Sequence, residues 1–377
     1  MKWSLKLGSI GGIGVYLHWT FVLLIGWVFL GSLGAGRTPG EALAGVGFIL
    51  ALFACVVLHE FGHALTAKRY GVTTRDITLL PIGGVARMES IPKKPMQEFW
   101  VAVAGPAVNA VIAALLFGVL LLLGRADSTL AVGEFRGGFG FLQQLMWVNV
   151  FIGTFNLLPA LPMDGGRVLR ALLSLRLGRL RATSIAANLG QVMAILFVIY
   201  GFVANPFLIF IGIFVYLGAQ GEAAQVETES ALEGLRVRDA MMTRFRTLSA
   251  HDPLGKAVEE LLAGSQQDFP VLENEEVVGI LRRNDLVKAL ADGQLQAVVG
   301  DVMSRDCSPV NESDVLTSTL EAMGKKEYSM APVLGGGRVV GLLTMENIGE
   351  LIMVNAAMAG GIPKGEVGFH QSGIPSR

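Results

Sequence analysis

The chain has 377 residues, of which 52% are apolar and only 16% are charged, and its mean hydropathy is +0.54. This composition is typical of a membrane protein with a soluble part attached, and the net charge of −1 argues against a general nucleic-acid binder. Cys55 and Cys307 imply no disulfide framework, so we expect the soluble part to be cytoplasmic.

Six apolar segments approach the length of about 20 residues that a membrane-spanning helix needs. No convincing small-residue cleavage site follows the first segment, so it is interpreted as a retained span and not as a signal peptide. A break at Asn205-Pro206 separates the last two segments. The predicted spans cover residues 17–33, 42–67, 98–123, 141–158, 185–204 and 206–217, after a glycine-rich lead over residues 1–16.

The second span contains the stretch Leu58-His59-Glu60-Phe61-Gly62-His63. On a helix, His59 and His63 share one face, about 6 Å apart along the axis. Two imidazoles on one face, with a carboxylate beside the first, form the His-Glu-x-x-His arrangement of zinc peptidases. The histidines would hold Zn²⁺ and Glu60 would act as general base. The alternative, a polar cluster inside a six-helix transporter, is disfavoured because polar groups within a span are costly.

Residues 68–97 connect the second and third spans and contain two short apolar runs around Gly83-Gly84. This pattern predicts a β-hairpin, near Thr74 to Met88, whose edge could pair with an extended substrate. The third span contains Gly105-Pro106-Ala107-Val108-Asn109, in which Asn109 is either functional or part of a small-residue element for helix packing.

The fourth span runs into Pro159 and Pro162, which forbid a regular helix just before Asp164. Irregular backbone at membrane depth is tolerated only where it lines a cavity or is buried in protein. A catalytic zinc usually has three protein ligands, so Asp164 is the candidate for the third. The alternative is that Asp164 is the N-cap of the helix that follows. His18, at the far end of the first span, is interpreted as an interfacial residue.

Basic residues in short loops predict the orientation. Eleven lysines and arginines follow the second and fourth spans, against three in the loops of the opposite side, which places both termini and the soluble part in the cytoplasm. His59 lies nine residues before Lys68 at the predicted interface, hence about 13 Å deeper in the bilayer. Residues 167–181 are basic and amphipathic, which favours a helix at the membrane surface.

The combined motifs resemble the site-2 protease family of intramembrane zinc metalloproteases, in the branch that carries two cystathionine-β-synthase-type (CBS) domains. The matching elements are His59-Glu60-Phe61-Gly62-His63, Gly105-Pro106-Ala107-Val108-Asn109, and Asn156…Pro159…Pro162-Met163-Asp164-Gly165, where Met163 replaces the usual leucine. The resemblance implies that zinc binds His59, His63 and Asp164, that Glu60 is the catalytic base, and that Asn156 holds the substrate or the developing oxyanion. It also implies transmembrane substrates such as membrane-tethered transcription regulators, anti-sigma factors or leftover signal peptides.

Residues 236–355 contain an internal repeat with a constant offset of 62. Pro270-Val271-Leu272 recurs as Pro332-Val333-Leu334, and Val278-Gly279 recurs as Val340-Gly341. The offset predicts duplication of one βαββα-like unit, and hence an α+β module. Its pattern resembles paired CBS domains, which implies an adenine nucleotide (ATP, ADP or AMP) between the repeats and a homodimer formed through the pair.

The nucleotide-contact pattern of CBS domains is Gly, two residues, Ser or Thr, two residues, Asp. The first repeat offers Gly279…Arg282…Asp285 and the second offers Gly341…Thr344…Asn347, so each copy lacks one polar group. Asp285, Thr344 and Asn347 are therefore candidate nucleotide contacts, and nucleotide binding is left open. The predicted domains are residues 1–220 (transmembrane zinc metalloprotease), 221–235 (helical linker), 236–290 and 291–356 (CBS repeats) and 357–377 (a disordered tail).

The sequence thus predicts a polytopic α-helical membrane protein with about six transmembrane helices and a cytoplasmic tandem CBS module. The leading hypothesis is an intramembrane zinc endopeptidase that cuts membrane-protein substrates in the cell membrane. The alternatives are a nucleotide-gated transporter or channel without peptidase activity, and an inactive scaffold. No ring of charges recurs across the spans, which disfavours the former, and the intact ligands and Glu60 disfavour the latter.

Overall fold

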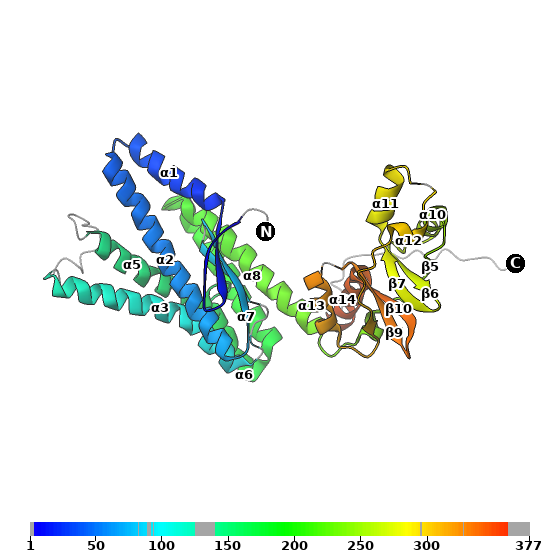
Figure 1. Ribbon diagram of the computed structural model, residues 1–377. Coiled ribbons are helices and arrows are strands. Elements are labelled where there is room, and N and C mark those ends of the chain that lie inside the picture. Colours follow the sequence, from blue (N-terminus) through cyan, green and yellow to red (C-terminus); the bar gives the residue numbers. More distant parts are fainter. Residues whose placement is uncertain are drawn as a thin grey trace. The chain divides into compact units, whose positions relative to one another are not determined.

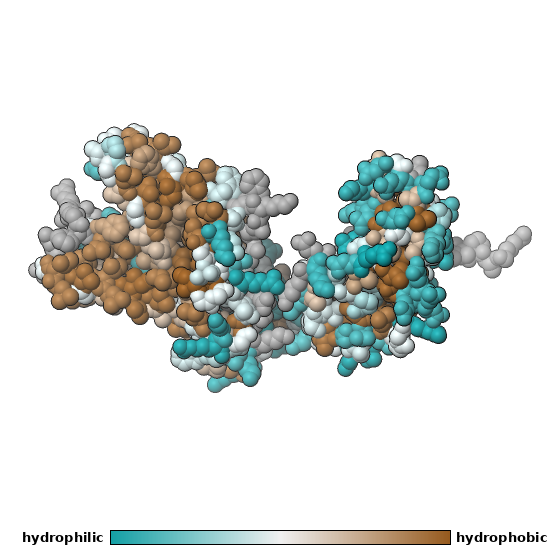
Figure 2. Space-filling view, in the orientation of Figure 1, coloured by the Kyte–Doolittle hydropathy of each residue, from teal (hydrophilic) through white to brown (hydrophobic). Residues whose placement is uncertain are grey.

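The computed structural model describes residues 4–81, 83–88, 92, 94–124, 140–294, 296–326 and 328–360. The chain forms two compact units, residues Met1–Val226 and Glu227–Arg377 (Figure 1). The first unit shows a mostly hydrophobic face and the second a mostly hydrophilic one (Figure 2). A membrane domain followed by a water-exposed domain accounts for this contrast, because large contiguous apolar surfaces are rare on proteins that face water.

A four-stranded sheet belongs to the first unit and has the order β1-β2-β3-β4. β2 and β3 are parallel, whereas the pairs β1–β2 and β3–β4 are antiparallel. The predicted hairpin near Thr74 to Met88 is confirmed as β3–β4, but Gly83-Gly84 is the start of β4 and not the turn. The strands are β1 (Ser4–Ile10), β2 (Ile13–His18), β3 (Thr74–Leu80) and β4 (Gly83–Met88).

The first hairpin, β1–β2, occupies most of the glycine-rich lead, for which no strand was predicted, and extends to His18. Its turn is Gly11-Gly12, with φ of 62° and 89°, and a type I′ turn needs two such positive angles. Ile10 pairs with Ile13 directly across this turn. A Gly-Gly pair between apolar runs was a hairpin signal in the sequence, and it was overlooked.

Helices occupy all six predicted spans. Four of them, α2, α3, α7 and α8, are long and apolar enough to cross a membrane, whereas α1 has 15 residues and α5 has 17. A multi-pass membrane domain follows from these helices, and the count of six spans stays a prediction. The helices of this unit are α1 (Thr20–Gly34), α2 (Pro39–Arg69), α3 (Pro95–Leu122), α5 (Gly140–Asn156), α6 (Asp164–Leu177), α7 (Arg179–Val203) and α8 (Phe207–Ala231).

α2 is the central element of the membrane unit. It starts with a capping box, in which the Glu41 N–H donates to Thr38 Oγ1 at 3.3 Å and the Thr38 N–H donates to the Glu41 carboxylate at 2.8 Å. It then runs for 31 residues and packs closely on α3, since a Cβ added at Gly62 would lie 2.7 Å from the Ala104 carbonyl oxygen. This close approach brings the histidine-bearing face of α2 against α3.

The second unit contains the predicted duplication. Both repeats have the order βαββα. One isolated bridge pairs Met242 with Leu342, and another pairs Ile280 with Ser304. Ser304 is equivalent to Met242 and Leu342 is equivalent to Ile280 at the offset of 62. The segment that follows the first helix of each repeat therefore pairs with the last strand of the other repeat, as expected for two repeats related by two-fold pseudosymmetry. The elements are α9 (Val237–Ala240), β5 (Leu248–Ser249), α10 (Leu254–Ala263), β6 (Phe269–Glu273), β7 (Glu276–Leu281), α11 (Arg283–Ala291), α12 (Val299–Val302), β8 (Val310–Asn311), α13 (Leu316–Lys326), β9 (Met330–Gly335), β10 (Arg338–Thr344) and α14 (Met345–Gly360).

The predicted boundaries near the second unit shift slightly. α8 continues to Ala231, so most of the predicted linker is part of this helix. α14 reaches Gly360, so the first residues of the predicted tail are helical, and residues 361–377 lie outside the described part of the chain.

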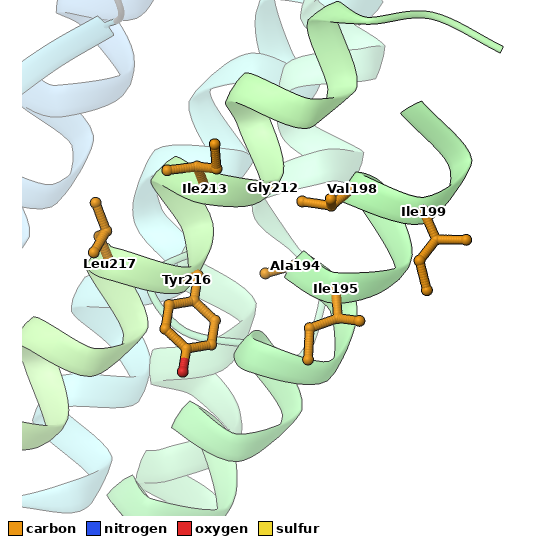
Figure 3. Close-up of a pocket in the computed structure, with 8 residues that line it drawn as sticks. All are labelled: Ala194, Ile195, Val198, Ile199, Gly212, Ile213, Tyr216 and Leu217. Atoms are coloured by element: carbon orange, nitrogen blue, oxygen red, sulfur yellow. The ribbon is translucent and has the colours of Figure 1, made fainter. Parts of the chain in front are cut away.

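An apolar pocket lies between α7 and α8 (Figure 3). Ala194 and Val198 of α7 and Gly212 and Tyr216 of α8 contribute to its lining. No acidic, basic or thiol side chain lines it. Its chemistry suits hydrocarbon and not catalysis, so the candidate catalytic groups must be sought elsewhere.

Candidate metal centre

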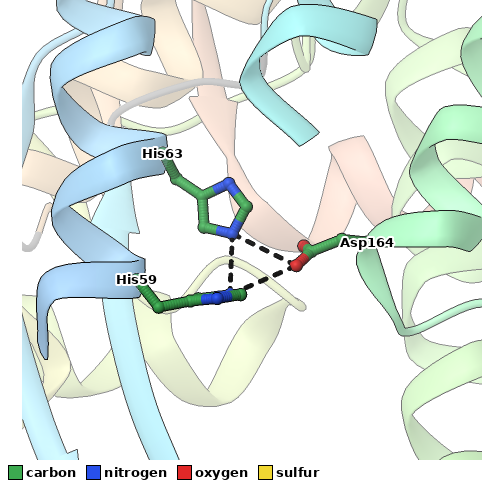
Figure 4. Close-up of side chains that lie close together, drawn as sticks. All are labelled: His59, His63 and Asp164. Atoms are coloured by element: carbon green, nitrogen blue, oxygen red, sulfur yellow. Dashed lines mark hydrogen bonds and ion pairs between the residues drawn. The ribbon is translucent and has the colours of Figure 1, made fainter. Parts of the chain in front are cut away.

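Three potential ligand atoms from α2 and α6 converge in the membrane unit (Figure 4). His59 Nε2 and His63 Nε2 lie 3.1 Å apart, and each lies 3.2 Å from Asp164 Oδ2. All three residues are buried. Ligands about 2.0–2.1 Å from a tetrahedral zinc ion are separated by about 3.3 Å, so the triangle has the size of one face of such a coordination shell. The residues therefore fit a zinc ion.

Asp164 is the first residue of α6, and Met163 is its N-cap. The alternative interpretation of Asp164 as the N-cap is therefore wrong. The Asp164 carboxylate instead contacts the two histidines. The preceding turn folds back against the helix: a Cβ at Gly165 would lie 2.2 Å from the Leu157 carbonyl oxygen, and one at Gly166 would lie 2.3 Å from the Ala160 carbonyl carbon. The two glycines thus permit the turn that aims Asp164 at α2.

Hydrogen bonds behind the histidines fix their ring orientation. His63 Nδ1 donates to the Val101 carbonyl oxygen at 2.7 Å, and His59 Nδ1 donates to Asn109 Oδ1 at 2.5 Å. Asn109 Nδ2 in turn donates to Asn149 Oδ1 at 2.9 Å. With the proton on Nδ1, each ring presents its Nε2 lone pair to the centre.

Asn109 and Asn149 are both completely buried. The sequence analysis left the role of Asn109 open between function and helix packing, and the structure places its amide behind His59. Asn149 was not singled out. Its signal was present, since an amide in the middle of a predicted span needs a polar partner. Asn149 finds that partner in Asn109 and also donates to the Leu145 carbonyl oxygen at 2.8 Å.

Gly105 forms the α3 wall of the centre. A Cβ at this position would lie 2.2 Å from His63 Nε2 and 2.7 Å from His59 Nε2. Only a residue without a side chain leaves room for the three ligand atoms and an ion among them. The glycine of the Gly105-Pro106 element is therefore a steric requirement of the centre.

Glu60 is half-buried beside the first histidine and faces strand β4. A Cβ at Gly84 would lie 2.9 Å from Glu60 Cγ, so the backbone of the β3–β4 hairpin covers this carboxylate side chain. Glu60 is not one of the three converging residues, which leaves its carboxylate available as a base.

The structure does not join Asn156 to this cluster. Asn156 is the half-buried last residue of α5, and within the described part of the chain it makes no hydrogen bond to Glu60 or to the three converging residues. His18 is the last residue of β2, two residues before α1 begins, and its Nδ1 is 2.8 Å from Thr20 Oγ1.

The candidate nucleotide contacts lie in the second unit, at equivalent helix starts. Asp285 is in the first turn of α11. Thr344 precedes α14 and accepts a hydrogen bond from the Asn347 N–H at 3.2 Å, and its hydroxyl donates to Asn347 Oδ1 at 2.6 Å. The Thr344 and Asn347 side chains thus bind each other, and no described hydrogen bond links them to Asp285.

The predicted basic helix over residues 167–181 ends at Leu177, and Arg170 is completely buried, so this arginine does not belong to an exposed basic face. Glu98 and Glu222 surround it, and Glu222 also binds Arg167. The Glu222 carboxylate raises the pKa of the Arg167 guanidinium above its ordinary value, against the opposing effect of burial. Arg167 therefore carries a positive charge, and it lies three residues after Asp164 on the same helix.

Comparison with family models finds two kinds of domain. Residues 47–133 and 134–200 match the model of peptidase family M50. Residues 237–292 and 299–353 match the CBS domain.

Relatives extend over most of the chain. A zinc metalloprotease of Methanocaldococcus jannaschii is 33% identical over 349 residues, which cover 92% of this chain and 96% of that protein. Rip3 of Mycobacterium tuberculosis is 32% identical over 380 residues, 94% of each chain. The solved site-2 protease from Methanocaldococcus jannaschii is 39% identical, and the match covers 59% of this chain and 95% of that one with a TM-score of 0.44.

Proposed function

Because the chain belongs to peptidase family M50, the zinc metalloproteases of the site-2 type, we propose that His59, His63 and Asp164 hold its catalytic zinc and that Glu60 is the general base. The observation that carries this assignment is the buried triangle of two Nε2 atoms and one carboxylate oxygen, 3.1 to 3.2 Å on each side. The adjoining CBS pair completes the domain organisation.

Zinc bound there would act as a Lewis acid and lower the pKa of a coordinated water to about 7. Asn109 and the Val101 carbonyl hold His59 and His63 in the tautomer that the ligand role needs. Glu60 accepts a proton from the attacking water and passes it to the amine that leaves. Asn156, at the end of α5, is proposed to donate a hydrogen bond to the developing oxyanion or to hold the substrate.

The proposed substrates are transmembrane segments of membrane proteins, such as membrane-tethered regulators or anti-sigma factors. The support is that the base and two ligands lie within α2, a helix long and apolar enough to span a bilayer. The excess of basic residues after the second and fourth spans supports a cell-membrane location with both termini and the CBS pair in the cytoplasm. The family disfavours the alternative of a transporter or channel without peptidase activity.

Strand β4 is proposed to receive the unwound substrate. It is an edge strand of the described sheet, and its Gly84 packs against Glu60. A helical substrate hides its peptide bonds, so it must unwind before attack, and pairing with an edge strand stabilises an extended segment. A segment paired with β4 would therefore lie beside the general base.

We expect Gly84→Pro to lower cleavage of a transmembrane substrate by about 10-fold or more, because proline removes a backbone donor from the strand and its ring also meets Glu60. Zinc content should be unchanged, since Gly84 contacts Glu60 and none of the proposed ligands. The matched control is Gly8→Pro in β1, the opposite edge of the same sheet, which should cleave normally. Cleavage at the wild-type rate in Gly84→Pro would remove β4 from the account.

For the second unit, we propose that an adenine nucleotide binds between the repeats and regulates cleavage, with Asp285, Thr344 and Asn347 as contacts. The match of both repeats to the CBS domain supports this. The nucleotide changes activity only if it has different affinity for two states of the enzyme. Association of two chains through the CBS pair belongs to the same proposal.

A further inference from the structure

A cluster of four charges, two of them buried and two half-buried, lies next to the metal centre, and we call it the charge tetrad: Arg167 and Arg170 of α6, Glu98 of α3 and Glu222 of α8. Arg167 Nη2 lies 2.6 Å from Glu222 Oε1, and Arg170 Nη1 lies 3.0 Å from Glu222 Oε2. Arg170 Nε donates to Glu98 Oε1 at 2.7 Å. Two positive and two negative groups thus tie three helices together.

The charge tetrad is poorly explained by stability alone. The Arg170 side chain has 0% exposure and that of Glu98 has 5%, so both charges have lost their hydration. Desolvation of buried ion pairs offsets most of their attraction, and apolar replacements are often neutral or stabilising. The arrangement instead fixes geometry, because paired guanidinium and carboxylate groups are directional.

The helices that the charge tetrad joins are those that build the metal centre. Arg167 lies three residues after Asp164, on the same side of α6, and Arg170 lies one turn beyond Arg167. On α3, Glu98, Gly105 and Asn109 follow one another at spacings of seven and four, which places them on one face. This face of α3 also contacts His59 and His63.

We propose that Glu222, acting through Arg167 and Arg170, is a positioning residue that holds Asp164 at the ligand distance from the two histidines. The inference rests on the proposed function, in which Asp164 binds zinc. If Glu222 positions Asp164, the zinc affinity of the centre depends on α8, which carries Glu222. Glu222 lies five residues before Glu227, where the second unit begins, so α8 is the covalent path from the CBS pair to this contact.

The test measures zinc affinity of the full-length protein in detergent by competition with a chelator, together with the visible spectrum of the Co²⁺-substituted protein. Glu222→Gln removes the charge that holds both arginines, so zinc affinity should fall, at most by the factor of about 10 to 100 that follows loss of a group bonded directly to a metal ligand. The cobalt spectrum should shift, since one ligand moves. Glu227→Gln, an exposed change on the same helix, should leave both quantities unchanged.

A second variant separates positioning from folding. Glu222→Gln leaves an unbalanced buried arginine, which lowers thermal stability by itself. Arg167→Gln/Glu222→Gln restores the balance between Arg170 and Glu98, so thermal stability should recover while zinc affinity stays low. Wild-type zinc affinity in Glu222→Gln, or recovery of affinity together with stability in the double variant, would overturn the inference.

Asp164→Asn distinguishes this outcome from failure of the proposed function. If Asp164→Asn loses zinc and Glu222→Gln does not, only the positioning role is wrong. If Asp164→Asn binds zinc as tightly as the wild type, Asp164 is not a ligand and both proposals are wrong.

Discussion

Glu60→Gln is expected to keep its zinc and to lose cleavage of a reconstituted transmembrane substrate by about 10²- to 10⁴-fold, the range that general acid–base catalysis contributes. Glutamine has the shape of glutamate but cannot accept the proton. The metal should stay, because the converging ligand atoms come from His59, His63 and Asp164. Cleavage in proteoliposomes and the zinc content of the same preparation measure the two effects separately.

The matched control for this variant is Glu41→Gln, the same change on the same helix. Glu41 belongs to the capping box at the start of α2, and glutamine also serves in a capping box. Glu41→Gln should therefore cleave normally. Wild-type cleavage by Glu60→Gln would contradict the assignment of the base, whatever the metal content.

Gly105→Ala is expected to abolish both zinc binding and cleavage, although it adds a single methyl group. The added carbon would lie 2.2 Å from His63 Nε2 and 2.7 Å from His59 Nε2, which is inside the space that a ligand and its ion need. α2 and α3 are in close contact beside this site, because a Cβ added at Gly62 would lie 2.7 Å from the Ala104 carbonyl oxygen. Zinc content per chain and circular dichroism show whether the centre is lost while the helices remain.

Gly118→Ala supplies the control on the same helix. A Cβ at Gly118 meets no atom within 4 Å, so alanine there should retain zinc and cleavage and, if anything, favour the helix. Full zinc occupancy in Gly105→Ala would show that Gly105 does not bound the metal site.

Local patterns in the sequence predicted most of the centre. His59 and His63 are four residues apart on a helix, and this spacing alone places their rings together. Asp164 was predicted because two prolines break a span just before it, and irregular backbone at membrane depth is tolerated only where it lines a cavity or is buried in protein. The β3–β4 hairpin was predicted from Gly83-Gly84, which begins β4 and is not its turn, whereas Gly11-Gly12 does form the turn of β1–β2.

Contacts between distant segments were not predictable in the same way. Arg170 looked like a surface residue because its helix is basic, and its partners Glu222 and Glu98 lie 52 and 72 residues away. Burial of a charge depends on which helices pack together. The periodicity of a single segment does not predict which other helix will pack against it. The pairing of Asn149 with Asn109 across 40 residues escaped prediction for the same reason.

His59, His63 and Asp164 are proposed to hold one zinc ion within the helices of the membrane unit. The most direct test is metal analysis with zinc X-ray absorption spectroscopy on the purified full-length protein, beside His59→Ala and Asp164→Ala. We predict about one zinc per chain with two imidazole nitrogens and oxygen in its shell, and loss of that zinc in both variants. Sulfur ligands, or wild-type zinc content in either variant, would contradict the account.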